Sequence, residues 1–525
     1  MLKKIFALVL MSIVFVLGQS SQLAAQEPEK PAEKDAKPAD AKPAPEPPAP
    51  KEESSVTDHT LKIGAQTIAY KATASTTLIK DDKGDPTASI FTIAYARSDT
   101  KDLSQRPISF VYNGGPGSSS IWLHMGAFGP RRVVTTDAGP TPPPPFKLVD
   151  NGDCLLDRTD LVFIDPVGTG FSRAVGKSKD KDFWGIDQDV KSLAQFIATY
   201  ISRNGRWNSP KFLIGESYGT FRSAALGNYL QNHNGMYLNG IVLISSVLDL
   251  GTISFPPGND MPYIFYLPSY AATAYYHKVL QEPPADLNAF LAEARQFASS
   301  EYAAALMKGA NISAADKADI AKKVSHFTGL SEDYLIKADL RVNLPQFMAE
   351  LQRSRKLSTG RLDARFSGPA PDLLAEYADY DPQSTAVEGA FVAAFNNYVR
   401  EELKFGKDLT YNTAAHFDGA QWDWKRAGRG ERYGFPGAPN VEDDLVEAMV
   451  TNPHLHIEVE NGLYDLATPF FATEFTMTHL GLPENLQKNI GLKYYDAGHM
   501  MYLHEEDLAK LKANVAAFLD NATKQ

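Results

Sequence analysis

Short apolar runs separated by longer amphipathic segments occupy most of the chain. Apolar positions three or four residues apart predict helices at 187–201 and 505–519. The short runs predict strands of a parallel sheet that helices cover on both faces, and they lie at 108–112, 161–164, 212–214, 241–244, 456–459 and 491–495. Together the two patterns indicate the α/β class of folds.

Two regions depart from this rhythm. Near the N-terminus, alternating apolar and polar positions predict antiparallel strands at 60–71, 73–80 and 88–97. Within 251–437 the strand pattern stops, and amphipathic helices are predicted, such as 285–308 and 313–326. We expect this block to form a helical cap over the C-terminal ends of the strands, where open α/β sheets bind ligands. The prediction is a mostly parallel central sheet with antiparallel N-terminal strands and an inserted cap.

The first 55 residues differ from the rest. Lys3 and Lys4 precede an apolar run at 5–17, so residues 1–25 are predicted to be a bacterial signal peptide for export to the periplasm or beyond. The run is short for a membrane span, although retention as an uncleaved anchor is an alternative. Residues 26–55, rich in Pro, Ala, Lys and Glu, are predicted to be a disordered linker. The remainder is predicted to comprise a catalytic domain, 56–250 with 438–525, and the cap, 251–437.

Composition narrows the possible partners and cofactors. The formal net charge of −11 argues against nucleic acid as a partner. Cys154 is the only cysteine, which excludes an intrachain disulfide and a cysteine-based zinc site. His454 and His456 alternate along a predicted strand, but no third metal ligand is in register with them. We therefore expect no metal, no cofactor and no stable membrane span after signal cleavage. No pattern in the sequence specifies an oligomeric state.

The most informative stretch is 211–226. An apolar run is followed by Gly215-Glu216-Ser217-Tyr218-Gly219, which fits the pattern G-x-S-x-G, and then by helical spacing. This order of strand, sharp turn and helix is the setting in which the motif carries a nucleophile. Glycines flank the serine because a neighbouring Cβ would collide in so tight a turn. Ser217 is the candidate nucleophile.

A base and an acid follow at matching positions. His499 comes directly after the last predicted strand, and Asp465 comes directly after the strand before it. The order Ser217, Asp465, His499 is the one that α/β-hydrolases use for their catalytic triad. His504 is a rival base at the start of the last helix. Asp496 is a rival acid, closer to His499 in the chain but not placed to orient its ring.

A glycine-rich loop, Asn113-Gly114-Gly115-Pro116-Gly117, follows an early predicted strand, and consecutive glycines let backbone N–H groups approach a substrate carbonyl. Together with the Gly-Glu-Ser-Tyr turn, this loop resembles the serine carboxypeptidase family, a branch of the α/β-hydrolases. Further matching segments lie at 165–172, 461–469 and 497–500. The resemblance covers most of 100–250 and 440–520, and it implies the α/β-hydrolase fold. The predicted cap carries no matching motif.

The resemblance implies roles for individual residues. The N–H groups of Gly115 and Tyr218 would form the oxyanion hole, and Met500 would border the pocket for the leaving residue. A second group would bind the C-terminal carboxylate of the substrate, and its members are Asn113, Gly114 and Glu216. Arg131 and Arg132, downstream of the loop, are either additional anion-binding groups or a solvated surface pair.

Glu216 has a physical consequence of its own. A substrate carboxylate beside it is tolerated only when Glu216 is protonated, so like-charge proximity raises its pKa and favours activity at acidic pH. The alternative is a solvated, variable position within the turn.

Three positions depart from the family pattern. Ser118 stands where many relatives have a cysteine, Val111 where the family has tryptophan, and Ala127 where it has an acidic residue. These departures concern carboxylate recognition rather than the triad.

The sequence thus predicts an exported serine carboxypeptidase that removes residues from peptide or protein C-termini through an acyl-enzyme, favoured at acidic pH. An esterase or acyltransferase with the same triad is one alternative, and a catalytically inactive binding protein on a hydrolase scaffold is another.

Overall fold

The structure, a computed structural model, describes residues 50–417, 421–426 and 437–524. The predicted signal peptide at 1–25 and most of the predicted linker at 26–55 lie outside these residues and stay predictions. The first strand, β1, begins at Ser54, two residues before the predicted start of the folded part. None of the helices within the described residues is long and apolar enough to cross a membrane.

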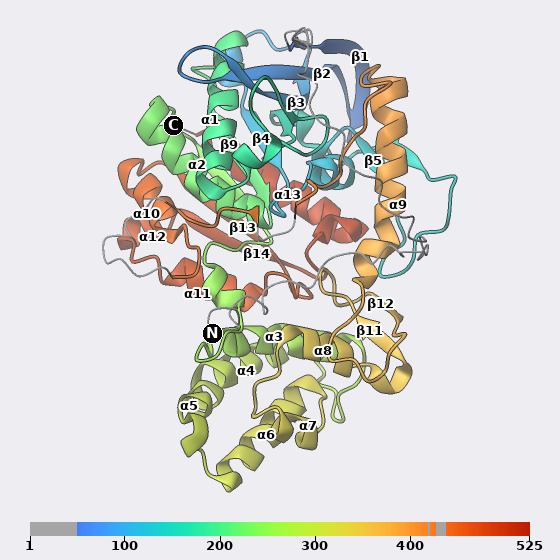
Figure 1. Cartoon of the computed structure of the whole chain (residues 1–525), viewed down its shortest axis with the longest axis vertical. Helices are drawn as coiled ribbons and strands as arrows, with labels where there is room; N and C mark the ends of the chain where they lie inside the picture. Colours follow the sequence, from blue (N-terminus) through green and yellow to red (C-terminus); the bar gives the residue numbers. More distant parts are fainter. Residues whose placement is uncertain (1–49, 418–420, 427–436, 525) are drawn as a thin grey trace, which may run out of the picture.

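A ten-stranded sheet forms the centre of the molecule (Figure 1). Its strands lie in the order β1-β2-β3-β7-β4-β9-β10-β13-β14, and β8 pairs with β3. Strands from β7 to β14 in this order are parallel, and β1 to β3 are antiparallel, as the sequence predicts. Their bounds are β1 Ser54–Ile63, β2 Gln66–Lys80, β3 Pro86–Arg97, β4 Ile108–Tyr112, β7 Asp160–Ile164, β8 Arg173–Ala174, β9 Lys211–Glu216, β10 Gly240–Ile244, β13 His456–Gly462 and β14 Ile490–Tyr495.

One predicted strand boundary is wrong. The chain turns at Gly64, which has a φ of 56°, and β2 then runs unbroken through residue 72, where the sequence pattern predicts a gap. Buried and more exposed positions alternate along β2 through that point, and it contains neither glycine nor proline. Nothing in β2 therefore interrupts the ladder.

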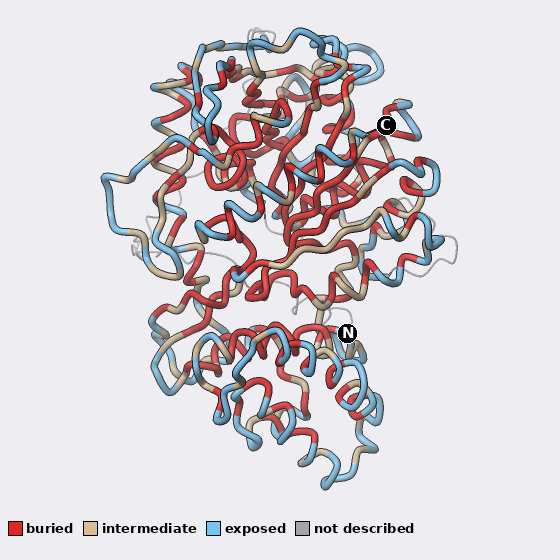
Figure 2. The backbone as a smooth tube through the Cα atoms, turned by 180° about the vertical axis from the view of Figure 1, so that it is seen from behind, coloured by how far each residue is buried: buried red, intermediate tan, exposed pale blue. Residues whose placement is uncertain are grey.

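Helices cover both faces of the sheet, which explains why β4, β7, β9 and β10 are buried at every residue. Phe212 and Ile214 of β9 face one core, and Leu213 between them faces the other. The Leu213 core includes α1 (Ile186–Arg203), α2 (Tyr218–Asn234) and α10 (Glu442–Thr451). The opposite core includes the π-helix Leu123–Phe128, α9 (Pro382–Asn397) and α13 (Glu505–Ala522). Figure 2 shows the buried strands at the centre of the domain.

The segment predicted as a cap divides between two places. One part forms a helical group with its own core below the sheet in Figure 1. Its helices are α3 Met261–Tyr276, α4 Leu287–Phe297, α5 Ala303–Met307, α6 Ala314–Thr328, α7 Glu332–Lys337 and α8 Leu344–Glu350. By contrast, α9 packs into the core of the sheet domain. The remaining elements are β5 Arg131–Val133, β6 Leu148–Asp150, β11 Leu357–Thr359, β12 Ser367–Pro369, α11 Phe470–Thr478 and α12 Glu484–Gln487.

Candidate active site

The turn between β9 and α2 carries Ser217. Its φ of 61° and ψ of −130° are strained for a residue with a side chain. A Cβ on Gly215 would lie 2.2 Å from the carbonyl oxygen of Gly219, and one on Gly219 would lie 3.1 Å from that of Tyr112. Glycine is therefore sterically required at 215, a Cβ at 219 would be a tight fit, and the sharp turn leaves Ser217 partly exposed at the start of α2.

His499 and Asp465 lie on loops that leave the same edge of the sheet. Asp465 follows β13 and His499 follows β14, and these two strands are parallel neighbours. The Nδ1 atom of His499 lies 2.7 Å from Oδ2 of Asp465, and both side chains are buried. Asp465 also accepts hydrogen bonds from the backbone N–H groups of Ala467 and Thr468 and from the Thr468 hydroxyl.

The protonation of His499 follows from this pairing. Burial alone lowers the pKa of the imidazole, but the adjacent Asp465 carboxylate outweighs it and raises the pKa above the ordinary 6.5. A hydrogen bond from Nδ1 to Asp465 leaves Nε2 free to accept a proton, which is the tautomer that a general base requires.

The glycine-rich loop lies directly on the turn that carries Ser217. A Cβ on Gly114 would lie 2.4 Å from the backbone nitrogen of Tyr218 and 2.6 Å from that of Gly219. Gly115 has a φ of 105°, which residues with a Cβ rarely adopt. The two segments predicted to form the oxyanion hole are thus in contact.

Glu216 is buried beside Ser217 and accepts two hydrogen bonds. Asn113 donates from Nδ2 at 2.9 Å, and the hydroxyl of Tyr502 donates at 2.8 Å. Burial raises the pKa of Glu216 to about 7, against the smaller opposing effects of His499 and the two donors. The alternative of a solvated, variable position is therefore wrong, since Glu216 is 4% exposed.

Two residues of this site were not predicted. Tyr502 follows Met500 without any sequence pattern that marks it. Arg222 is fully buried; it binds Asp189 at 2.7 Å and donates to the carbonyl oxygen of Asn113 at 2.7 Å. Apart from His233 near its end, α2 contains no ionisable side chain of Lys, Arg, Asp, Glu or His other than Arg222. A single arginine in such a helix was the sequence feature that could have marked it.

Met500 is buried and contacts the N-terminal turn of α9. The amide of Gln383 donates to its sulfur at 3.2 Å. Of the departures from the family pattern, Ser118 accepts a hydrogen bond from Trp122, Val111 is buried in β4, and Ala127 is buried with its carbonyl bound by Asn151.

Neither the rival base nor the rival acid occupies the position predicted for the triad. His504 binds Asp507, and Asp496 is exposed. The two arginines downstream of the glycine loop form ion pairs with carboxylates: Arg131 with Asp150 and Glu402, and Arg132 with Glu505.

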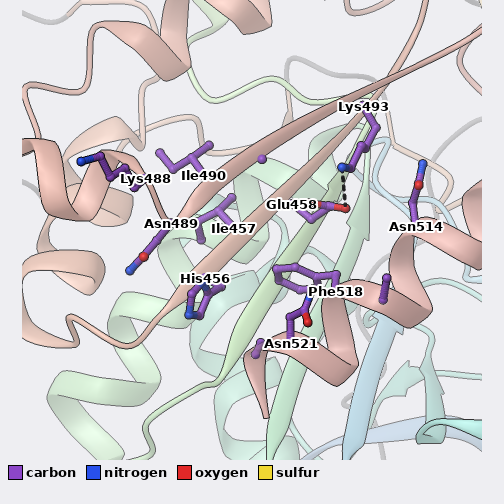
Figure 3. Close-up of a pocket in the computed structure, with 13 residues that line it drawn as sticks. His456, Ile457, Glu458, Lys488, Asn489, Ile490, Lys493, Asn514, Phe518 and Asn521 are labelled. Atoms are coloured by element: carbon purple, nitrogen blue, oxygen red, sulfur yellow. Dashed lines mark ion pairs between the residues drawn. The ribbon is translucent and has the colours of Figure 1, made fainter. Parts of the chain in front are cut away.

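His456 lines a pocket of about 240 Å³ between β13, β14 and α13 (Figure 3). Glu458 and Lys493, which form an ion pair at 4.0 Å, line the same pocket. Because the pocket includes the first residues of β13 and β14, it lies at the opposite end of these strands from Asp465 and His499. Within the described ranges, no three His, Cys, Asp or Glu residues are grouped to hold a metal ion.

A serine on a strand–helix turn, and an acid and a histidine after the last two strands of a mostly parallel sheet, define an α/β-hydrolase. The chain belongs to the serine carboxypeptidase family, because the sequence model of that family matches residues 86–348, half of the chain.

Individual relatives agree with this assignment. The chain is 29% identical over 161 residues to the pheromone-processing carboxypeptidase KEX1 of Saccharomyces cerevisiae, a match that covers 29% of this chain and 21% of that protein. It is 28% identical over 173 residues to serine carboxypeptidase-like 50 of Arabidopsis thaliana, covering 32% of this chain and 37% of that one. The matches thus span well under half of these relatives. The crystal structure of the yeast KEX1 protein superimposes with a TM-score of 0.54 at 17% identity, covering 86% of this chain and 91% of that one, and shows the same fold.

Proposed function

We propose that this protein is a serine carboxypeptidase that removes residues from the C-termini of peptides through an acyl-enzyme. The family and the arrangement of Ser217, Asp465 and His499 support hydrolytic chemistry. The observation that carries the narrower proposal is the buried pair of Glu216 and Asn113 next to the nucleophile. An ester or amide without a free carboxylate has no need of that pair.

In this mechanism Ser217 Oγ attacks the last peptide carbonyl while Nε2 of His499 takes its proton. Asp465, bound to Nδ1, stabilises the imidazolium. The N–H groups of Gly115 and Tyr218 stabilise the oxyanion. His499 then protonates the leaving amine, and water, deprotonated by the same imidazole, hydrolyses the acyl-enzyme.

The substrate carboxylate binds at Asn113, Gly114 and Glu216. Because the pKa of Glu216 is raised to about 7, this side chain is protonated at acidic pH and donates a hydrogen bond to the substrate carboxylate. Above pH 7 it carries a negative charge and repels the substrate. Binding should therefore weaken as pH rises through about 7.

The test compares an N-blocked dipeptide with its C-terminal amide between pH 4 and 8. We expect the free acid to be cleaved much faster below pH 7, and S217A to lose on the order of 10³-fold or more of the turnover. Equal rates for acid and amide would favour the esterase or acyltransferase. Failure of a phosphonylating reagent to label Ser217 would identify an inactive scaffold.

We also propose that the protein is exported from a bacterial cell. Lys3, Lys4 and the apolar run at 5–17 support this location. Expression of the full chain in a bacterial host, followed by fractionation and N-terminal sequencing, should yield envelope or medium protein that starts near residue 26. Full-length protein in the cytoplasm would contradict export.

A further inference from the structure

Two consecutive residues at the end of β10 contact the backbone of all three segments that carry the triad. The carbonyl oxygen of Ile244 accepts a hydrogen bond from the N–H of Ser217 at 3.0 Å. The N–H of Ser245 donates to the carbonyl of Glu460, in the strand that leads to Asp465, at 2.9 Å. The hydroxyl of Ser245 donates to the carbonyl of His499 at 2.7 Å.

Ser245 makes these contacts in a strained conformation. Its φ is 52°, in the left-handed region, and its side chain is 1% exposed. A residue with a Cβ persists there only when its surroundings impose the conformation, and such residues cluster at active sites. Ser217, at the end of the neighbouring strand β9, has a similar φ of 61°. Adjacent strands of the sheet thus end in two strained serines, one of which is the nucleophile.

His499 is held through its ring and through both of its backbone groups. Its ring binds Asp465 at 2.7 Å, its N–H donates to the carbonyl of Leu362 at 2.6 Å, and its carbonyl accepts from Ser245. The two backbone contacts fix the peptide units on either side of the imidazole. Of the two, only the bond from Ser245 is made by a side chain and can be removed by a point substitution.

We propose that Ser245 is a positioning residue for the general base: its hydroxyl fixes the backbone of His499, and the strained backbone at 245 is retained because it aims that hydroxyl. This inference rests on the proposed function, since it takes His499 as the base. Ser245 acts through His499 and does not contact the reacting atoms.

The neighbouring residue provides a matched control. The hydroxyl of Ser246 is also buried, at 4% exposure, but has no hydrogen-bond partner within the described residues. Ser246→Ala therefore removes an equivalent buried hydroxyl from the same loop without breaking a hydrogen bond to another described residue. A structural effect of deleting a buried hydroxyl would appear in both variants, whereas a positioning effect would appear only at Ser245.

The experiment compares S245A, S245G and S246A with the wild type. For each protein it measures kcat and KM on a blocked dipeptide acid, and the midpoint of thermal unfolding. A slightly misplaced base should lower kcat about 10- to 100-fold in S245A and S245G, with KM nearly unchanged. S245G should unfold at a higher temperature than S245A, because glycine adopts a φ of 52° without strain. S246A should stay within about two-fold of wild-type kcat.

The thermal midpoint and kcat should therefore not change together. S245G should be more stable than S245A and yet have an equally low kcat. Wild-type kcat in both Ser245 variants, beside an active wild type, would overturn the positioning role and leave the proposed function intact. An inactive wild type would instead count against the proposed function.

A readout independent of turnover is the downfield NMR resonance of the His499 Nδ1 proton, identified by its loss in D465N. We expect this resonance to move or broaden in S245A and S245G but not in S246A. An unchanged resonance in both Ser245 variants would contradict the proposal whether or not the enzyme is active.

Discussion

The loop after β13 and the end of β9 each bury one carboxylate near His499, but they surround it differently. Asp465 accepts four hydrogen bonds, at 2.7–2.9 Å, from two backbone N–H groups, a hydroxyl and the imidazole. Glu216 accepts two, both from uncharged side chains. The loop after β13 supplies two donors from its own backbone, whereas Glu216 relies on residues distant in sequence.

The surroundings of the two carboxylates fit them for different roles under the proposed function. Four donors replace the water that Asp465 loses on burial. Two neutral donors do not achieve this for Glu216, and burial raises its pKa to about 7. Asp465 is suited to orient the imidazole through hydrogen bonds, and Glu216 is suited to change charge near neutral pH.

The largest expected effect comes from replacing Asp465, the acceptor of the imidazole N–H. In D465N the amide cannot accept from Nδ1–H of His499, so the ring takes the other tautomer and Nε2 can no longer accept the proton of Ser217. We expect kcat to fall about 10⁴-fold, by analogy with the same change in serine proteases. Steady-state kinetics at saturating substrate measure it.

D496N is the matched control. Asp496 is only three residues from His499 but is exposed, so its replacement should leave kcat within about two-fold. A larger loss in D496N than in D465N would show that the orienting acid has been assigned to the wrong residue.

The placement of the three candidate triad residues at strand ends could be predicted because each depends on local sequence and chain order. The turn at Ser217 needs glycines at fixed positions, and Asp465 and His499 follow apolar runs that are recognisable strands. The sheet was predictable for the same reason, since β4, β9 and β10 are buried runs.

Contacts between distant segments were not predictable. The donation by Tyr502 to Glu216 and the bond between Ser245 and His499 join residues more than 250 positions apart. The prediction of a helical block at 251–437 likewise did not indicate that α9 would pack into the core of the sheet domain. Helical periodicity identifies the face of a helix that is buried. Only the tertiary structure identifies the element that this face packs against.

A smaller effect is expected from E216Q, which removes the group that changes charge. Glutamine can still donate to a substrate carboxylate, so turnover of a blocked dipeptide acid at pH 5 should fall only about 10-fold. The loss of activity that the proposed function predicts as pH rises through about 7 should disappear, because E216Q has no group at this position to ionise. Profiles of kcat/KM against pH for the acid substrate measure both effects.

Stability should change with pH in the opposite sense to an ordinary salt-bridged acid. The pKa of Glu216 rises from 4.5 to about 7 on folding, so between these values the folded protein binds more protons than the unfolded chain, and stability falls as pH rises. We therefore compare the free energy of unfolding of E216Q with that of the wild type at each pH. From pH 4 to pH 8 this difference should shift by about 3 kcal/mol in favour of E216Q. Denaturant unfolding at both pH values measures the gain.

A second buried glutamate, Glu460, allows the effect of pH on stability to be distinguished from its effect on kcat/KM. It is also buried, burial raises its pKa to about 8, and Tyr495 donates to it at 2.7 Å. E460Q should therefore relieve a similar loss of stability at high pH without changing the pH profile of kcat/KM. If E460Q flattened the activity profile as E216Q does, global stability rather than carboxylate recognition would explain the pH dependence.

The smallest effect tests the donors that set the pKa of Glu216. The bond from Tyr502 favours the ionised form and partly offsets burial, so Y502F should raise the pKa of Glu216 further. The descending limb of kcat/KM should then move to higher pH by about half a unit to one unit, with a change of only a few-fold at pH 5.

Y495F removes the equivalent donor from Glu460 and should leave the limb in place. A shift to lower pH in Y502F would mean that Tyr502 supports the protonated form instead. Asn113 and Tyr502 would then act in opposite directions on the pKa of Glu216.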